Sequence, residues 1–274
     1  MVTFFGVLVG LVLGLTGAGG SVFAVPLLML GLGWTIAQAM PVALIAVCAA
    51  ATLGTLVAWN ASFVRYRAAI VMALVGCLTA PLGLRLADRL PDSWLTAAFA
   101  AVLVVVALRL IVQARGNPAE TQVVRATVAG DGKPARGPLC RANETTGRLV
   151  WTSRCAMVIS SIGATTGFLS GMLGVGGGFV IVPALRAGTV LSMHSAVATS
   201  LMNIALTSAG TVVTSMAMGR TLPWMVALPF VGGSLAGMLA GRRIARRIAG
   251  PRLQQSFAAV MFCAAAILIF RAAR

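Results

Sequence analysis

Long apolar runs, separated by short polar breaks, take up most of the chain. An α-helix needs roughly 20 mainly apolar residues to cross a bilayer, and several runs are that long. The first two runs are shorter, so the pattern does not decide whether each crosses alone. It predicts an all-α polytopic membrane protein with helical segments at residues 2–15, 21–33, 38–59, 67–87, 93–113, 152–173, 178–190, 194–217, 223–241 and 253–271.

The composition of the 274 residues supports this class. Hydrophobic residues make up 59%, charged residues only 9%, and the mean hydropathy is +0.98. The net charge of +16 does not indicate nucleic-acid binding, because the basic residues are spread over loops with almost no aromatic residues between them. No Ser/His, paired-Asp or His-Glu pattern indicates an enzyme, a metal site or a cofactor. The expected partner is the lipid bilayer.

One glycine-rich stretch occurs twice, 157 positions apart. Residues 14–26 read G-L-T-G-A-G-G-S-V-F-A-V-P, and residues 171–183 read G-M-L-G-V-G-G-G-F-V-I-V-P. Further matches keep this offset to within one residue, which indicates a duplicated unit of roughly 110 residues, as in many transporters. We expect an N-terminal transmembrane repeat at 1–113, a basic cytoplasmic linker at 114–150 and a C-terminal transmembrane repeat at 151–274.

The direction of the second repeat depends on how the segments beside each glycine stretch cross. A single broken helix leaves the repeats parallel, whereas two short crossings or a re-entrant hairpin give an odd number of crossings and invert the second repeat. Basic residues gather in cytoplasmic loops. We predict inverted repeats, because only five of the 21 basic residues then lie on the non-cytoplasmic side: Arg85, Arg89, Arg220, Arg271 and Arg274. The expected location is the inner membrane.

The glycine stretches are the candidate substrate site. Non-helical backbone at membrane depth persists only where it is buried in protein or lines a wet cavity. The short helix after each stretch begins near Gly20 or Gly177, and its first amide groups attract an anion. We expect the two helix starts to meet near the midplane. The backbone candidates are Gly17, Gly19, Gly20, Gly174, Gly176, Gly177 and Gly178, with Pro26 and Pro183 as structural residues.

Polar side chains near these stretches add candidate ligands: Ser21, Thr199, Ser200 and Asn203. Thr199 and Asn203 are four residues apart and share a helix face. Hydroxyl and amide groups suit the oxygen atoms of a sulfonate or carboxylate, or a coupling sodium ion. Bonding to a carbonyl of the preceding turn is an equal alternative for these groups. The site is expected to be one-sided, because the first repeat has apolar residues at the matching places: Val42, Ala43 and Ala46.

Spaced glycines and cysteines are interpreted as packing residues. Small residues let membrane helices approach closely, which applies to Gly10, Gly14, Gly76, Gly83, Gly232, Gly233, Gly237 and Gly241. The cysteines have no paired spacing, so we expect small core residues and no metal or redox site. The five are Cys48, Cys77, Cys140, Cys155 and Cys263.

The sequence restricts how transport is driven. Neither glycine stretch is followed by Lys-Ser or Lys-Thr, so a nucleotide-binding loop is missing and ATP hydrolysis is not expected. No Asp or Glu lies in the middle of an apolar run, which disfavours a carboxylate proton relay and suits an anion pathway. A proton or a sodium ion is the candidate coupling ion. His194, the only histidine, is interpreted as a helix-end residue.

The duplicated G-x-x-G-x-G-G element with its following proline, and A-V-A-T-S-L at 196–201, resemble the TauE/SafE family of anion permeases, the sulfite exporters. The resemblance covers almost the whole chain except the linker. It implies ATP-independent transport of sulfite, thiosulfate, sulfonates or small carboxylates. It also points to the glycines and prolines of both stretches and to the Thr199-Ser200 pair. Val42 and Ala43 depart from that pattern in the first repeat.

The sequence therefore predicts a secondary active transporter for a small anion, sulfite or an organosulfonate. One alternative is an anion channel of the same architecture. Another is a non-transporting scaffold whose basic linker docks an acidic partner. The direction of transport and the formation of a homo-oligomer stay open.

Overall fold

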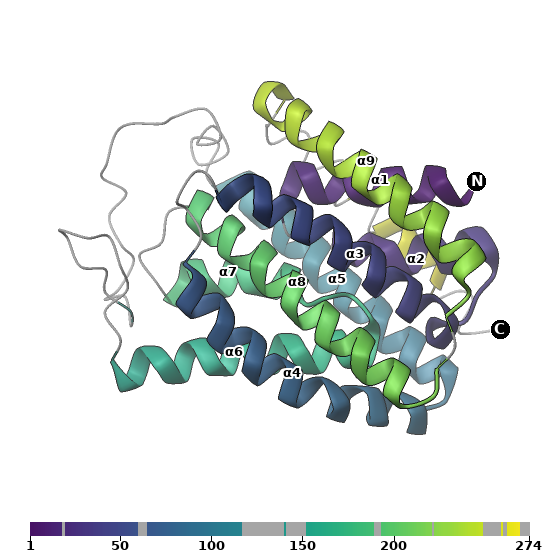
Figure 1. The fold of residues 1–274 in the computed structure, drawn as a ribbon, viewed down its shortest axis with the longest axis horizontal. Coiled ribbons are helices and arrows are strands. Elements are labelled where there is room, and N and C mark those ends of the chain that lie inside the picture. The colour runs from purple at the N-terminus through teal and green to yellow at the C-terminus, as the bar shows by residue number, and fades with distance from the viewer. Residues whose placement is uncertain are drawn as a thin grey trace.

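The computed structural model describes residues 1–17, 20–59, 65–116, 140, 152–188, 193–220, 222–248, 259 and 262–268. The elements within these ranges are α-helices that lie alongside one another in a bundle (Figure 1). They are α1 (Val2–Thr16), α2 (Ser21–Leu32), α3 (Ile36–Trp59), α4 (Tyr66–Arg89), α5 (Asp92–Gly116), α6 (Ser153–Leu173), α7 (Gly178–Gly188), α8 (Met193–Ala217) and α9 (Trp224–Ile248).

The predicted all-α class and the predicted segments are confirmed to within a few residues for these helices. The largest difference is at α9, which continues past residue 241 to Ile248. The added residues, with several arginines among them, are mostly good helix formers, so a polar composition does not stop the helix. Of the tenth predicted segment, residues 262–268 are helical, and most of the remainder lies outside the described residues.

Several helices are long and apolar enough to cross a membrane. They extend over Ile36–Ala58, Tyr66–Arg89, Ser153–Leu173, Ser195–Ala217 and Trp224–Ile244. The helices α1 and α2 are shorter, as the apolar runs predicted. The chain is therefore a multi-pass membrane protein.

The outward face of α4 shows how this bundle suits lipid. Leu74, Leu78 and Leu82 lie one turn apart and are exposed on the bundle surface. The small residues Gly76 and Gly83 on the opposite face are buried. Large apolar side chains facing outwards and small ones facing a neighbouring helix are typical of membrane helices.

α1 packs along α9 through glycines spaced four residues apart. A Cβ atom at Gly6 would collide with the carbonyl group of Phe230, and one at Gly14 would collide with that of Met238. Residue numbers rise together along this contact, so the two helices run in the same direction. The absence of side chains at these positions lets the two backbones approach this closely.

α4 packs along α6 in the same manner. A Cβ atom at Gly167 would collide with the backbone of Gly76. Thr79 adds a hydrogen bond across the pair, because its hydroxyl donates to the carbonyl oxygen of Ala164 at 2.9 Å. Residue numbers again rise together, so α4 and α6 run in the same direction.

Most of the glycines predicted to be packing residues do pack against a neighbouring helix: Gly10, Gly14, Gly76, Gly83, Gly233, Gly237 and Gly241. The prediction was wrong for Gly232, where an added Cβ atom would meet nothing within 4 Å. Consecutive residues point about 100° apart around a helix. Since Gly233 faces α1, its neighbour Gly232 faces away and is exposed.

α3 and α8 lie side by side at the centre of the bundle (Figure 1), and their contact is called the α3–α8 crossing below. The thiol of Cys48 donates to the carbonyl oxygen of Ala205 at 3.4 Å, and these residues are 157 positions apart. A Cβ atom at Gly54 would lie 3.3 Å from the Leu201 side chain. Residue numbers therefore rise in α3 as they fall in α8, which makes the two helices antiparallel. The interval of 157 also separates the two glycine stretches, so the crossing joins corresponding residues.

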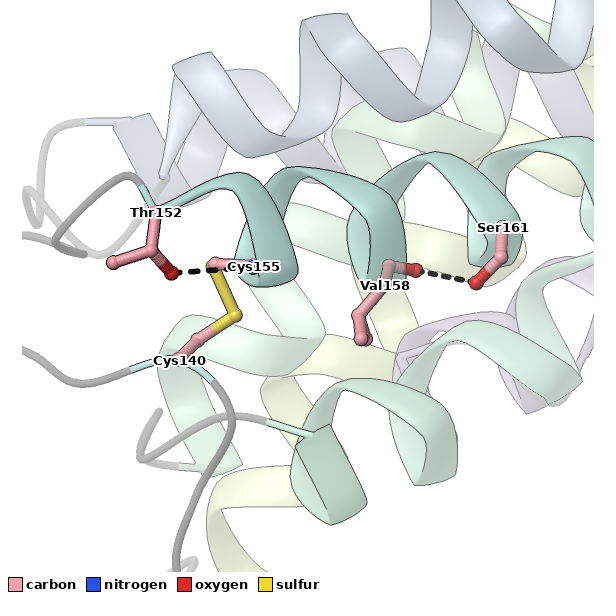
Figure 2. Close-up of a disulfide and its surroundings, with 5 residues drawn as sticks. All are labelled: Cys140, Thr152, Cys155, Val158 and Ser161. Atoms are coloured by element: carbon pink, nitrogen blue, oxygen red, sulfur yellow. Dashed lines mark hydrogen bonds between the residues drawn. A yellow bond between two sulfur atoms is a disulfide. The ribbon is translucent and has the colours of Figure 1, made fainter.

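Cys140 and Cys155 form a disulfide that joins residue 140 to the first turn of α6 (Figure 2). Both cysteines are buried, and the Cys155 amide donates to the Thr152 hydroxyl oxygen at 3.3 Å. The interpretation of these two cysteines as unpaired core residues was therefore wrong. Their separation of 15 residues, across a segment without apolar periodicity, gave no pairing signal.

Candidate functional site

The glycine turns at the ends of α1 and α6 lie at opposite ends of the α3–α8 crossing. A Cβ atom at Gly17 would collide with the Val197 side chain, and one at Gly174 with that of Met40. Each contacted residue lies two turns before the crossing on its own helix. Because the helices are antiparallel, roughly 24 Å of helix length separates the turns. The two turns therefore do not meet, although α2 and α7, the short helices that follow them, contact each other.

The second stretch doubles back from its turn. Gly174, Gly176 and Gly177 have φ of 70°, 68° and 66°, a left-handed backbone that glycine adopts without strain. The amide of Gly174 ends α6 by donating to the carbonyl oxygen of Ser170. A Cβ atom at Gly177 would then lie 2.7 Å from that of Thr166, two turns back along α6. The chain therefore returns toward the middle of the bundle.

The backbone at Gly176 reaches the α3–α8 crossing. A Cβ atom there would lie 3.0 Å from the hydroxyl oxygen of Ser208, and 3.4 Å from both Val47 and Ile204. α7 begins two residues later, at Gly178. The first amide groups of a helix have no intrahelical partner and carry the positive end of its dipole. The second stretch thus brings a helix start to the centre of the bundle, as predicted for both.

The first stretch is built differently. Gly17 has φ of 73°, and its amide donates to the carbonyl oxygen of Leu13 at 2.7 Å. Gly20 has φ of −66°, which any residue can adopt. Close packing explains the glycine at this position, because a Cβ atom would collide with the backbone of Leu13. α2 therefore starts beside the last turn of α1.

Four further candidates belong to the two stretches, and the structure describes two of them fully. Ser21 is fully buried at the start of α2, and Pro26 is buried inside that helix. Gly19 and the side chain of Pro183 lie outside the described part of the structure.

Asn203 is the most unusual polar side chain of α8. It is fully buried, and neither atom of its amide group has a hydrogen-bond partner among the described residues. It precedes Ile204, which lies against Gly176. Leaving a buried amide unpaired costs about 1–3 kcal/mol, so such a group indicates an absent partner such as a ligand or water.

Ser208 is a site residue that the sequence analysis missed. Its hydroxyl oxygen is buried without a partner among the described residues and lies beside Gly176. Hydroxyl groups on membrane helices usually bond to a carbonyl one turn back, as Thr207 does to Asn203 at 2.8 Å. The sequence does not reveal that the Ser208 hydroxyl lacks such a hydrogen bond. The residue 157 positions earlier is Ala51, so this hydroxyl has no counterpart on α3.

Thr199 and Ser200 have partners within the protein. The Thr199 hydroxyl oxygen accepts a hydrogen bond from the backbone amide of Arg65 at 3.1 Å. The Ser200 hydroxyl donates to the carbonyl oxygen of Val197 at 2.8 Å. Ser200 thus follows the local-bonding alternative, whereas Thr199 links the start of α8 to the start of α4.

The central groups offer hydrogen-bond donors in apolar surroundings. The first α7 amides can only donate, whereas the Asn203 amide and the Ser208 hydroxyl can donate or accept; the apolar Val47 lies beside Gly176 just before α7. Asp88 and Asp92, the acidic residues of the described ranges, lie at helix ends. Donors without a facing carboxylate favour an anion over a cation. The arrangement is suited to binding rather than to bond cleavage.

A bundle of membrane-crossing helices with buried, unpaired polar groups at its centre is typical of membrane transport proteins. The chain belongs to the sulfite exporter TauE/SafE family, which it matches over residues 2–268. It is therefore a membrane transporter.

Two relatives from Xylella fastidiosa carry the description "Probable membrane transporter protein". The one from strain Temecula1 is 32% identical over 234 residues, covering 84% of this chain and 78% of the relative. The one from strain 9a5c is 31% identical over 233 residues, with the same shares. No solved structure matches the chain.

Proposed function

We propose that this protein is a secondary active transporter of the inner membrane that moves a small anion, sulfite or an organosulfonate. Two polar groups of α8 without partners among the described residues carry the proposal: the Ser208 hydroxyl, which lies beside Gly176, and the Asn203 amide, which is buried on another face of the same helix. Amide and hydroxyl donors at a helix N-terminus suit the oxygen atoms of a sulfur oxyanion. The name of the family supports this substrate class.

The proposal includes two inverted halves, at residues 1–113 and 151–274. The antiparallel contact of α3 and α8 at corresponding residues supports it. A two-fold axis that relates two antiparallel helices is perpendicular to them, so for membrane-crossing helices it lies in the membrane plane, as in inverted repeats. The first and fourth helices of each proposed half also pair across the halves: α1 packs against α9, and α4 packs against α6. Alternating access then arises from rocking one half against the other about the crossing.

The short helices of the first half support an odd number of passes. A Cβ atom at Gly31 of α2 would collide with the ring of Phe5 of α1, while Gly20 lies against Leu13. Residue numbers fall along α1 as they rise along α2, so the two form an antiparallel hairpin. With three further helices, the half makes five passes if both short helices cross and three if the hairpin is re-entrant, and either odd number inverts the half that follows.

The linker at residues 114–150 is proposed to be cytoplasmic. Arg242 donates to the carbonyl oxygen of Gly54 at 2.6 Å, and Arg65 contacts Thr199. Both contacts lie at the end of the bundle where α3 ends and α8 begins. The grouping of basic residues at this end favours the cytoplasmic side for it.

Flux into proteoliposomes tests the function. Purified protein is reconstituted, and uptake of radiolabelled sulfite is measured with and without an opposing proton or sodium gradient. A transporter gives saturating uptake that responds to one of the gradients, whereas a channel gives uptake that rises linearly and follows the membrane potential alone. Uptake equal to that of protein-free liposomes, for sulfite and for benzenesulfonate, would contradict the proposal.

A further inference from the structure

Two arginines hold equivalent places in the bundle. Arg65 ends the connection between α3 and α4, and Arg220 lies in the connection between α8 and α9. Each contacts α3 or α8 near the beginning of that helix. The backbone amide of Arg65 donates to the hydroxyl oxygen of Thr199 in α8 at 3.1 Å. The guanidinium of Arg220 contacts the Met40 sulfur of α3 at 3.6 Å. One arginine therefore lies at each end of the α3–α8 crossing.

The charges of the two arginines are balanced differently. Arg220 forms an ion pair with Asp88 at the end of α4, and its side chain is only 15% exposed. The Nε atom of Arg65 is buried and has no hydrogen-bond partner among the described residues. A buried guanidinium donor without a partner is costly. Among the described residues, a carboxylate therefore neutralises Arg220 but none pairs with Arg65.

Arg65 lies at the start of the polar face of α8. Thr199, which Arg65 contacts, is one helical turn from Asn203, so the two side chains share a face. Asn203 is the fully buried amide without a partner. Arg65, Thr199 and Asn203 therefore follow one another along this side of α8.

We propose that Arg65 selects anions at the Thr199 end of the pathway and binds the substrate before it reaches Asn203. This inference rests on the proposed anion transport. Arg220 does not share the role, because Asp88 neutralises it. A guanidinium group binds the oxygen atoms of a sulfonate or sulfite by charge-assisted hydrogen bonds. The electrostatic attraction between this guanidinium group and an anion also acts beyond hydrogen-bond distance, and it weakens as the salt concentration rises.

The chain offers a matched control at Arg67. This arginine lies two residues further on, is exposed, and lines an open groove with Tyr66, Ile70 and Val71 on the outer surface of α4. Replacing it removes the same charge near the same helix start. A general effect of net charge would therefore be equal for the two positions.

The test measures radiolabelled sulfite uptake by proteoliposomes at low and high ionic strength for the wild type, Arg65→Gln, Arg65→Lys and Arg67→Gln. We expect Arg65→Gln to raise the KM for sulfite by roughly tenfold to a hundredfold, the range for a hydrogen bond to a charged group. Its KM should also lose most of the salt dependence. Arg65→Lys should keep the salt dependence, and Arg67→Gln should match the wild type.

Failure of the inference and failure of the proposed function give different results. Equal KM values and equal salt dependence for Arg65→Gln and Arg67→Gln would overturn the role of Arg65 and leave anion transport standing. No sulfite or benzenesulfonate uptake by the wild type would overturn both. Arg65→Gln keeps the backbone amide that bonds to Thr199. If that variant still fails to fold, Arg65→Lys decides: loss of its salt dependence contradicts the inference.

Discussion

The backbone of Gly176 lies against the hydroxyl group of Ser208, whose oxygen is 3.0 Å from the position a Cβ atom would take. Both residues belong to the second half, as do Asn203 and the start of α7. The facing helix α3 contributes apolar residues such as Val47. The polar part of the proposed site thus comes from one half, although both halves enclose it.

Substitution in the second glycine stretch is expected to abolish transport. Gly177→Leu forces a side chain onto a backbone with φ of 66° and against Thr166, so the start of α7 must move. Gly20→Leu should also abolish transport, because it pushes α2 away from α1. Sulfite uptake and membrane insertion are measured for each variant. Gly232→Leu, whose side chain enters open space, should transport normally; wild-type uptake by Gly177→Leu would refute the loop site.

The glycine contact between α1 and α9 is expected to govern stability. Gly10→Ala places a methyl group against the backbone of Ser234, and overpacking of this kind costs about 1–3 kcal/mol. Gly232→Ala, on the exposed face of α9, should change the free energy of unfolding little. Thermal unfolding of the detergent-purified variants, followed by size-exclusion chromatography, compares them. Equal midpoints would show that the two helices do not pack as described.

The disulfide provides a test of orientation. The structure pairs Cys140 with Cys155, but a cytoplasmic linker lies where thiols are kept reduced. If the linker is cytoplasmic, this disulfide should therefore be reduced in growing cells and form only when an oxidant is added. Cells are quenched in acid, and thiols are counted by a maleimide gel shift in a chain with Cys48, Cys77 and Cys263 replaced by Ala. A disulfide present before any oxidant is added would place residue 140 outside and reverse the proposed orientation.

Removal of linker residues separates transport from scaffolding. The proposed site uses no residue of the range 117–139, so a chain lacking it should take up sulfite at a rate within about twofold of the wild type. Uptake is measured in proteoliposomes at equal protein content. If the protein were a scaffold whose basic linker docks a partner, the wild type would show no uptake, and partner binding would disappear with the deletion.

The helical segments were predictable because long apolar runs mark them in the sequence. The glycines facing α1 and α9 could likewise be assigned to packing. Gly232 and Gly233 could not be told apart, because the choice between adjacent residues depends on the rotation of α9 about its axis.

The candidate site was harder to predict because it is defined by buried side chains that lack hydrogen-bond partners among the described residues. Ser200 and Ser208 look alike in sequence, yet only Ser208 lacks a hydrogen-bond partner among the described residues. The two glycine stretches are also nearly identical in sequence. Their turns nevertheless pack at Val197 and at Met40, at opposite ends of the crossing. The antiparallel contact between α3 and α8 fixes that separation, and a local motif carries no information about it.

The central claim is that Asn203 is left unpaired by the protein in order to bind the substrate, and Asn203→Leu tests it most directly. Because the variant removes a buried unpaired amide and keeps a similar volume, it should be more stable by about 1–3 kcal/mol. Sulfite uptake and sulfite-dependent thermal stabilisation should both disappear. Ser215→Ala is the control, since it removes another buried, unpaired hydroxyl of α8 far from the crossing and should transport normally. A stabilised Asn203→Leu protein that takes up sulfite with the wild-type KM would contradict the account.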